Sequence, residues 1–396
     1  SIILEIRIKM NLIIWVDPIN RDAHFLKLIA EQIHKQSLDS SFNFRVITTN
    51  RTEMELSETV PLNPFFSKFA SLPLGKLDPF KKLQILLAYY PSFNRIAGEL
   101  NKNSILLYSS GVSLPRLELM GLSLFKRKAK NLTMLVHNLE DMQRTPFWFF
   151  QSNQSKNKQF FSSFDRLIFL SKHMRDEALT RFNLEAEKTY VMLHPHFHPM
   201  LKSIQSDNDL VSQIKIASQG KPIMAYVSRL DLDHGIDIFY RTLAKLDVYG
   251  VVLGRLGKGW TLQANQTLLT ELGIDSSKLF LKIASYSYSE LLAVLGLSDF
   301  VLAPYRRISQ SGAIALALGE QVPVVASNIG ANGEMVKSGL NGILFNINDL
   351  DSLLQEIRLT YRTGQTMRDR FLPTPSFNSH LDPELAVKNM LCWLNK

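Results

Sequence analysis

The sequence predicts an α/β protein built from two doubly wound parallel sheets. Apolar runs of strand length alternate with helical patterns along the 396 residues, and this alternation is typical of parallel sheets wound by helices. A chain of this length exceeds what one hydrophobic core usually serves, so we expect two domains that meet near residue 200. Such domains in tandem place a ligand in the cleft between them, at the carboxyl ends of the strands.

The first half contains runs that fit buried strands and runs that fit helices. The expected strands are residues 11–17, 44–48, 104–109, 132–137 and 166–170. The expected helices are residues 25–36, 83–100 and 172–182, and residues 190–199 close this half.

The second half continues the alternation of strands and helices. The expected strands are residues 223–227, 249–253, 279–283, 300–304, 322–326 and 342–345. The expected helices are residues 236–246, 288–295, 312–318 and 350–362.

The composition indicates a globular cytoplasmic protein. Hydrophobic residues make up 45% and charged residues 20% of the chain, which excludes an intrinsically disordered protein. The single cysteine, Cys392, excludes an intrachain disulfide and fits a reducing compartment. The longest apolar runs have strand length, so no membrane helix is expected, and the N-terminus shows no signal-peptide cleavage site.

The net charge of +9 lies almost entirely in the first half. Residues 1–200 hold 26 Lys and Arg against 18 Asp and Glu, and residues 201–396 hold 19 against 18. Because no nucleic-acid module accompanies the basic excess, we expect no nucleic-acid partner. An anionic membrane surface, a phosphate-bearing acceptor and an ordinary solvated surface all remain open.

Residues 116–130 combine apolar side chains with a basic cluster. Lys126, Arg127, Lys128 and Lys130 end this segment, and aromatic residues follow at 147–150 and at 160–161. A basic helix edge with loop aromatics predicts a peripheral contact with the inner face of the plasma membrane. Apolar stripes of this kind are equally typical of a protein core.

The second half carries a series of short motifs in a fixed order. Tyr226-Val-Ser-Arg-Leu230 precedes His234-Gly235, and Val251-Val-Leu-Gly254 precedes Ser298-Asp-Phe-Val-Leu-Ala-Pro304. Then follow Ser311-Gly312, Val322-Pro-Val-Val-Ala-Ser327, Gly330, Glu334 and Gly339-Leu-Asn-Gly342. The series resembles the donor domain of glycosyltransferase family 4, and Val136-His-Asn-Leu139 and His194-Pro-His196 resemble its first domain more faintly.

This resemblance implies the GT-B architecture, in which two Rossmann-like domains face a central cleft. The domains would be residues 1–200 and 201–375, and a C-terminal helix at 376–396 would cross back to the first domain. The resemblance also implies a retaining transfer from a UDP-sugar, with UDP-glucose as the first candidate, and no metal or other cofactor. The acceptor would be a glycan or a lipid-linked glycan in envelope or exopolysaccharide synthesis.

The expected donor site binds a nucleotide diphosphate through a cation and a helix N-terminus. Arg229 stands at a strand end and can reach a diphosphate as a bidentate donor. The turn at Ser311-Gly312 opens a helix whose amides and dipole favour an anion, and charge builds on the leaving phosphate as the glycosidic bond breaks. The full predicted donor set is Arg229, His234, Gly254, Ile283, Tyr286, Arg307, Ser309, Gln310, Ser311, Gly312 and Glu334.

The sequence departs from the family pattern at three positions of this site. His234 stands where the family usually has Lys, so the second cation becomes titratable near neutral pH. Ile308 and Leu316 align with a pair of Glu residues that the family places on the donor sugar and the ribose. Some relatives have a pattern similar to Pro304-Tyr-Arg-Arg307 before Ser311-Gly312, so Arg307, Ser309 or Ser311 are candidates for donor contacts.

On the acceptor side, His137 directly follows a strand, where catalytic groups of such folds tend to lie. The resemblance suggests that it lies over the donor sugar and phosphate, and a purely structural role is the alternative. Asn138 and Asn20 are further acceptor-side candidates.

Three other motifs are weak signals of metal or phosphate binding. Asp231-Leu-Asp233 spells a metal motif of another glycosyltransferase fold, but it follows Arg229 in a loop whose expected chemistry uses protein cations. Residues 254–258 are too short for a phosphate loop. His194, His196 and His198 alternate, but prolines interrupt them and no Cys or acidic ligand lies nearby, so we expect no metal site.

Two alternatives to a transferase remain open. One is a GT-B sugar-nucleotide epimerase, for which the sequence shows no general-base carboxylates. The other is a homologue that binds a sugar nucleotide without turnover, which the missing Glu pair would explain.

Overall fold

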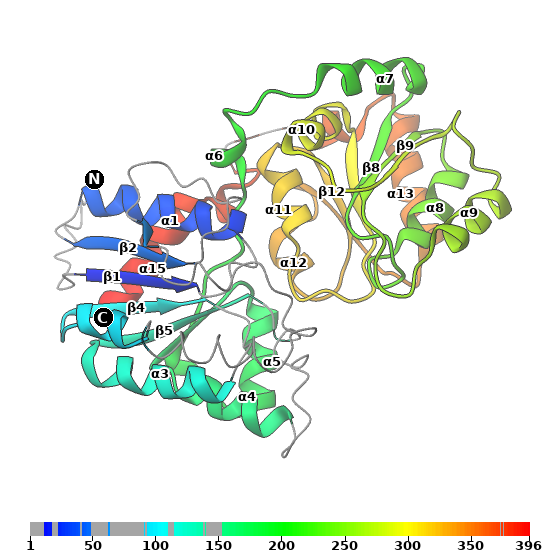
Figure 1. Ribbon diagram of the computed structural model, residues 1–396. Coiled ribbons are helices and arrows are strands. Elements are labelled where there is room, and N and C mark those ends of the chain that lie inside the picture. The colour runs from blue at the N-terminus through cyan, green and yellow to red at the C-terminus, as the bar shows by residue number, and fades with distance from the viewer. Residues whose placement is uncertain are drawn as a thin grey trace. The chain divides into compact units, whose positions relative to one another are not determined.

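The structure, a computed structural model, describes residues 12–17, 23–39, 42–48, 62–63, 91, 93–109, 115–137, 139, 153–372, 374 and 376–396. The chain forms two compact units, Ser1–Met192 with Pro383–Lys396 and Leu193–Asp382 (Figure 1). Each unit is a parallel sheet with helices on both faces, so the predicted fold class is confirmed.

The sheet of the first unit has the strand order β3-β2-β1-β4-β5-β6-β7, and its pairings are parallel. The strands are β1 (Leu12–Asp17), β2 (Asn43–Thr48), β3 (Leu62–Asn63), β4 (Ser104–Tyr108), β5 (Asn131–Val136), β6 (Arg166–Phe169) and β7 (Thr189–Val191). The helices are α1 (Ala23–Leu38), α3 (Pro115–Lys128), α4 (Asn153–Ser162), α5 (Lys172–Phe182) and α15 (Pro383–Asn395), and residues 93–99 are also helical.

Alternate residues of β1 belong to two different cores. Ile14 and Val16 pack in one core with residues of α3, α4 and α5. Ile13 and Trp15 pack in the other with residues of α1 and α15 (Figure 1). Because successive side chains of a strand point to opposite faces, both faces of this sheet are buried. Burial on both faces is the reason that the strands read as continuous apolar runs in the sequence.

Helix α15 joins the end of the chain to the first unit. It begins at Pro383, a residue whose fixed backbone angle suits the first position of a helix. Val387 and Leu394 lie in the same core as α1. The ring of Trp393 stacks on that of Tyr190 with centroids 5.2 Å apart.

The sheet of the second unit has the strand order β10-β9-β8-β11-β12-β13, again with parallel pairings. The strands are β8 (Ile223–Val227), β9 (Tyr249–Gly254), β10 (Leu279–Ile283), β11 (Phe300–Ala303), β12 (Val324–Ser327) and β13 (Gly342–Phe345). The helices are α6 (His198–Leu201), α7 (Asn208–Ser218), α8 (Ile236–Lys245), α9 (Leu262–Glu271), α10 (Tyr288–Leu297), α11 (Gly312–Gly319), α12 (Asn332–Met335), α13 (Leu350–Arg362) and α14 (Met367–Arg370).

Helices α4, α7 and α9 and the four-residue helices α6, α12 and α14 have no counterpart in the sequence analysis. Of these, α4 and α9 are rich in Gln, Asn, Ser and Thr, so their apolar periodicity is weak. The clearest local signal for α9 is Thr261, whose side chain accepts a hydrogen bond from the amide of Ala264 at 3.0 Å and so caps the helix.

The structure corrects one part of the membrane hypothesis. Phe160 and Phe161 were expected beside a loop at a membrane surface, but they lie on α4 and are buried in the first core. The aromatic residues at 147–150 lie outside the described residues. Among the described residues, the structure contains no helix that is both long and apolar enough to cross a membrane.

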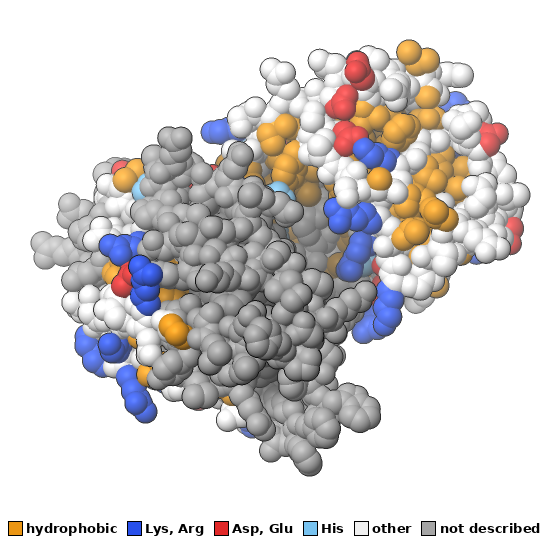
Figure 2. Space-filling model, viewed as in Figure 1, with side chains coloured by type: hydrophobic (Ala, Val, Ile, Leu, Met, Phe, Trp, Pro, Cys, Tyr) orange, Lys and Arg blue, Asp and Glu red, His pale blue; other side chains and the backbone are white. Residues whose placement is uncertain are grey.

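The basic end of α3 remains at the surface. Arg127, Lys128 and Lys130 are exposed, whereas Lys126 lies 3.2 Å from the carboxylate of Asp165. In Figure 2, Lys and Arg side chains (blue) gather at the left edge of the view, where Figure 1 shows one end of α3.

Candidate active site

The strand order of the second unit reverses between β8 and β11. From β8 the chain continues outward to β9 and β10, whereas β11 starts on the other side of β8 and leads to β12 and β13. The loops that leave these two neighbouring strands therefore diverge, and a crevice opens at their carboxyl ends. In doubly wound sheets, ligands bind at such a reversal.

A pocket of about 610 Å³ lies at this reversal. The loops after β8, β9 and β11 and the start of α11 line it, and its size lies within the range of small-molecule sites, about 300–1,000 Å³. The lining residues are Val227, Ser228, Arg229, His234, Gly254, Arg255, Leu256, Tyr286, Tyr305, Ile308, Gln310, Ser311, Gly312, Ala313 and Leu316.

Two basic groups and one carboxylate meet in the loop between β8 and α8. The carboxylate of Asp231 accepts hydrogen bonds from the backbone amide of His234 at 2.8 Å and is 2.6 Å from its ring Nδ1. The guanidinium of Arg229 lies 3.4 Å from Nε2 of the same ring. His234 is 8% and Asp231 is 6% exposed, whereas Arg229 is exposed. The loop therefore holds a rigid imidazole behind a solvent-facing guanidinium.

The imidazole of His234 lies between a carboxylate and a guanidinium. Its Nδ1 faces Asp231 and its Nε2 faces Arg229, so both ring nitrogens have a partner within this loop.

The buried hydroxyl of Tyr226 forms hydrogen bonds to the backbone of the same loop. It donates to the carbonyl of Arg229 at 2.6 Å and to that of His234 at 3.2 Å. Burial raises the pKa of Tyr226, so the hydroxyl remains protonated and can donate. The backbone that carries the Arg229 and His234 side chains is thus anchored at both residues.

Two glycines allow the loops to approach one another. A side chain at Gly254 would meet the carbonyl oxygen of Ser228 at 1.9 Å, and one at Gly235 would meet that of Pro304 at 1.9 Å. Gly235 also has a φ of 72°, a conformation that other residues rarely adopt. The close contact of these loops is therefore possible only with glycine at both positions.

Helix α11 begins at the pocket and leaves its first turn open. Ser311 caps it by accepting from the amide of Ile314 at 3.2 Å, and the hydroxyls of Ser311 and Tyr305 are 3.1 Å apart. No atom lies within 4 Å of the position that a side chain would take at Gly312. The side-chain oxygen of Gln310 is buried and has no hydrogen-bond partner in the described part of the chain. The amides of the first turn and the open space at Gly312 therefore face the pocket.

The structure brings together seven of the eleven predicted donor residues. Arg229, His234, Gly254, Tyr286, Gln310, Ser311 and Gly312 line the pocket, and Ile283, Arg307, Ser309 and Glu334 do not. The donor roles of the latter four stay predictions. The apolar pair that replaces the family Glu residues, Ile308 and Leu316, lines the pocket as well.

The sequence analysis missed several residues that line the pocket. Tyr305 is fully buried, with a pKa that burial raises, and its only signal was its place directly after a predicted strand. Arg255 follows Gly254 directly and adds a second exposed guanidinium at the ends of neighbouring strands. A basic residue immediately after a buried strand was the signal that could have found it.

The acceptor-side predictions fall on the first unit. His137 follows β5, is half-buried, and its ring meets that of Phe25 edge-on with centroids 4.5 Å apart. Asn20 and Asn138 lie outside the described residues. All three roles stay predictions.

The residues of the weaker motifs have structural partners. Asp231 bonds to His234, and His194 Nδ1 lies 2.9 Å from the carbonyl of Pro195. His196 is buried, which lowers its pKa to about 4 and favours the neutral ring. In the part of the chain that the structure describes, no three His, Cys, Asp or Glu side chains are grouped to hold a metal ion.

Comparisons with known proteins agree with this geometry. Residues 221–362 match the family model of glycosyl transferases group 1. No curated protein sequence matches the chain. Among solved structures, a glycosyltransferase from Rickettsia africae ESF-5 has a TM-score of 0.66 at 14% identity, and 97% of this chain and 96% of that chain are covered.

Two further solved structures share the fold over nearly their whole length. HepE from Anabaena, in complex with UDP and glucose, has a TM-score of 0.67 at 16% identity, with 96% of this chain and 98% of that chain covered. Sucrose-phosphate synthase from Thermosynechococcus elongatus has a TM-score of 0.64 at 15% identity, with 97% and 96% covered. Residues 221–362 thus match the family model of glycosyl transferases group 1, and the chain as a whole has the GT-B fold of the solved glycosyltransferases.

Proposed function

We propose that the chain is a retaining glycosyltransferase that moves a hexose from a UDP-sugar to a glycan or lipid-linked glycan. The observation that carries this proposal is the pocket at the strand reversal, where Arg229 and the open first turn of α11 face one volume. UDP-glucose is the first donor to test, because a structure of the similar HepE holds UDP-glucose. We place the reaction in envelope or exopolysaccharide synthesis.

The pocket suits a diphosphate whose charge grows during the reaction. Breaking the bond between the sugar and the diphosphate places an additional negative charge on the terminal phosphate of the departing nucleotide, and fixed donors that are already aimed at it lower the barrier. Arg229 supplies a charge-assisted bidentate contact, and the first amides of α11 supply neutral donors backed by the helix dipole. His137 is the proposed catalytic residue of the other unit, with Asn20 and Asn138 on the acceptor side.

The apolar residues at the family Glu positions bear on the alternatives. Ile308 and Leu316 cannot hold sugar or ribose hydroxyls, so polar donor contacts must come from other residues. The unsatisfied oxygen of Gln310 is the best placed, and Arg307 and Ser309 are further candidates. The same substitution favours a protein that binds the sugar nucleotide without turnover as the second candidate function. No comparable observation favours an epimerase.

The first prediction separates an enzyme from a binding protein. Purified protein with UDP-glucose should release UDP slowly, and the rate should be equal in EDTA and in Mn²⁺, because protein cations stabilise the leaving group. The measurement is coupled UDP detection beside a thermal-shift panel of UDP-, GDP- and ADP-sugars. A rise in melting temperature without UDP release would identify a binding protein. Activity that requires Mn²⁺ would make Asp231 and Asp233 metal ligands.

The second prediction concerns Arg229. Charge-assisted hydrogen bonds contribute about 1.5–3 kcal/mol, so Arg229→Ala should lower the affinity for UDP by about ten- to a hundredfold in calorimetry. Arg362→Ala is a matched control, because Arg362 is exposed at the end of α13 and does not line the pocket. Equal affinities for the two variants would remove Arg229 from the diphosphate site.

The third prediction concerns His234. Its Nε2 lies beside Arg229 in the pocket, so the ring is placed to contact the same diphosphate. A hydrogen bond to a charged group contributes about 1.5–3 kcal/mol, so His234→Ala should lower the affinity for UDP by about ten- to a hundredfold in calorimetry.

The control for this prediction is His234→Lys, which keeps a hydrogen-bond donor at this position and should retain most of the affinity for UDP. Equal UDP affinities of His234→Ala and the unchanged protein would remove His234 from the diphosphate site.

The fourth prediction concerns the membrane. We propose that the basic end of α3 contacts an anionic bilayer, supported by the exposure of Arg127, Lys128 and Lys130. Each such charge contributes about 1 kcal/mol near an anionic surface, so changing all three to Gln should reduce vesicle binding roughly a hundredfold at low salt. Co-sedimentation with anionic liposomes tests this. The control changes Lys202, Lys215 and Arg362, which are exposed on the other unit; equal pelleting of both variants would refute the contact.

A further inference from the structure

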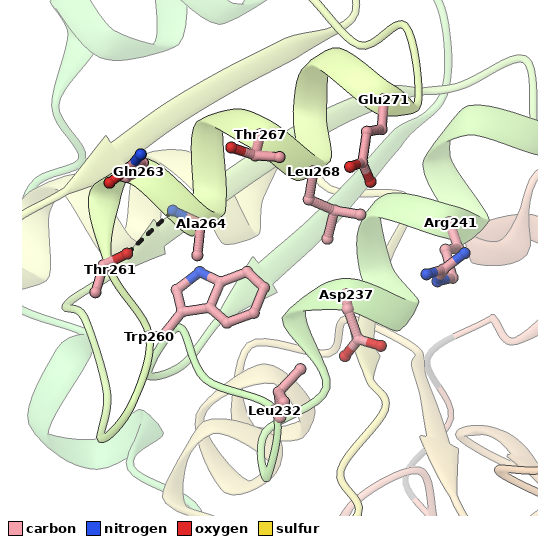
Figure 3. A pocket seen from close by; sticks show the side chains of 10 residues that line it. All are labelled: Leu232, Asp237, Arg241, Trp260, Thr261, Gln263, Ala264, Thr267, Leu268 and Glu271. Atoms are coloured by element: carbon pink, nitrogen blue, oxygen red, sulfur yellow. Dashed lines mark hydrogen bonds between the residues drawn. The ribbon is translucent and has the colours of Figure 1, made fainter.

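A second pocket of about 530 Å³ lies on the second unit, between α8 and α9 (Figure 3). The loop after β8 contributes Leu232, and α8 contributes Asp237 and Arg241. Trp260 and residues of α9 form the other wall. None of these residues lines the pocket at the strand reversal, and the proposed transfer reaction does not use them.

Trp260 is held as a rigid platform in this pocket. Its indole N–H donates to the side-chain oxygen of Asn265 at 3.2 Å, and the hydroxyl of Tyr240 donates to the same oxygen at 3.0 Å. Asn265 is buried, so its amide fixes the edge of the indole from inside the unit. Figure 3 shows the ring between α9 and α8, with Leu232 below it and Asp237 to its right. A fixed indole offers a large apolar surface at a low entropic cost of binding.

The charged groups around Trp260 balance. Asp237 accepts two hydrogen bonds from Arg306, at 2.6 and 2.7 Å. Arg241 and Glu271 are exposed, and neither forms an ion pair within the described part of the chain. The lining therefore holds one basic side chain, Arg241, and two acidic ones, Asp237 and Glu271, and Arg306 from outside the lining neutralises Asp237. A phosphate or another anion gains no net attraction from such a site.

These features together match the chemistry of a neutral sugar. A hexose has an apolar C–H face that lies flat on an aromatic ring, and its adjacent hydroxyls both donate and accept hydrogen bonds. A guanidinium offers paired donors and a carboxylate offers paired acceptors, so Arg241 and Glu271 complement such hydroxyls. We propose that the Trp260 pocket binds a neutral hexose unit of a glycan.

The position of this pocket suggests why a glycosyltransferase would have it. The loops after β8 and β9 line both pockets and are bonded to each other, from Leu230 N to Arg255 O at 2.8 Å and from Gly257 N to Leu230 O at 2.8 Å. A sugar bound at Trp260 would provide a second binding contact with a glycan substrate. This role rests on the proposed function, whereas the sugar binding itself does not.

Saturation-transfer NMR tests the proposal on the full chain. The probes are glucose, galactose, mannose, N-acetylglucosamine and maltotriose, each in the presence of saturating UDP. At least one probe should give a signal that Trp260→Ala reduces about tenfold or more, that Trp260→Phe largely restores, and that Arg241→Ala weakens. Arg241 is exposed, so its variant should fold even where Trp260→Ala does not.

The matched control is Trp393→Phe. Its ring is covered by Tyr190, with centroids 5.2 Å apart, and by the guanidinium of Arg166, 4.9 Å from the centroid, so this change should leave the signal intact. UDP affinity should be unchanged in the Trp260 and Arg241 variants, which separates this proposal from failure of the donor site. The proposal would be overturned if none of the probes gave a signal that depends on Trp260, or if these variants left the signal intact. A nucleotide that competes at Trp260 would overturn it as well.

Discussion

The reversal of strand order at β8 and β11 is the constraint on which the candidate site depends. Parallel strands carry their loops at one edge of the sheet, and only at a reversal do two adjacent loops leave in opposite directions. The loop after β8 can then bend over the sheet toward Pro304 at the end of β11. It does so because Gly235 leaves room for the Pro304 carbonyl. The same bend positions Arg229 and His234 at the start of α11.

The chemistry of the site follows from how this loop is held. Buried Tyr226 anchors its backbone and buried Asp231 anchors the His234 ring, so only Arg229 can adjust to a ligand. Asp231 lies 2.6 Å from Nδ1 of the His234 ring, so Nε2 is directed toward Arg229 in the pocket.

The sequence predicted the strands of the second unit closely and the helices less well. The limits of β8, β10 and β13 agree with prediction, because short apolar runs between polar loops have few alternatives in a parallel sheet. Helices α4 and α9 are among those that were missed, because Gln, Asn, Ser and Thr dominate them and their apolar periodicity is weak. Tertiary packing rather than local pattern determines such helices.

The same contrast applies to the two pockets. Seven of the eleven predicted donor residues line the first pocket. Arg229 and the Ser311-Gly312 turn were predicted from positions that a sequence displays, a strand end and a helix start, and the others from the resemblance to a known family. The Trp260 pocket depends on Asn265, a buried residue of the helix that the sequence analysis missed, and on Asp237 and Arg306, which are distant in sequence. A single Trp in a loop carries no signal of this arrangement, since its meaning comes only from the groups that packing brings beside it.

The apolar lining at Ile308 and Leu316 bears on both proposals. Apolar side chains offer no hydrogen bonds to a sugar, so under the proposed function the first pocket would discriminate among sugars less by hydrogen bonding. Specificity would then come from the remaining polar residues of that pocket, such as Gln310, or from contacts with the glycan outside it. The Trp260 pocket is suited to such a contact, because an indole beside paired charges can bind a neutral sugar without attracting the diphosphate. The two proposals would thus divide the recognition of a glycan between a site for its donor and a site for a neutral hexose.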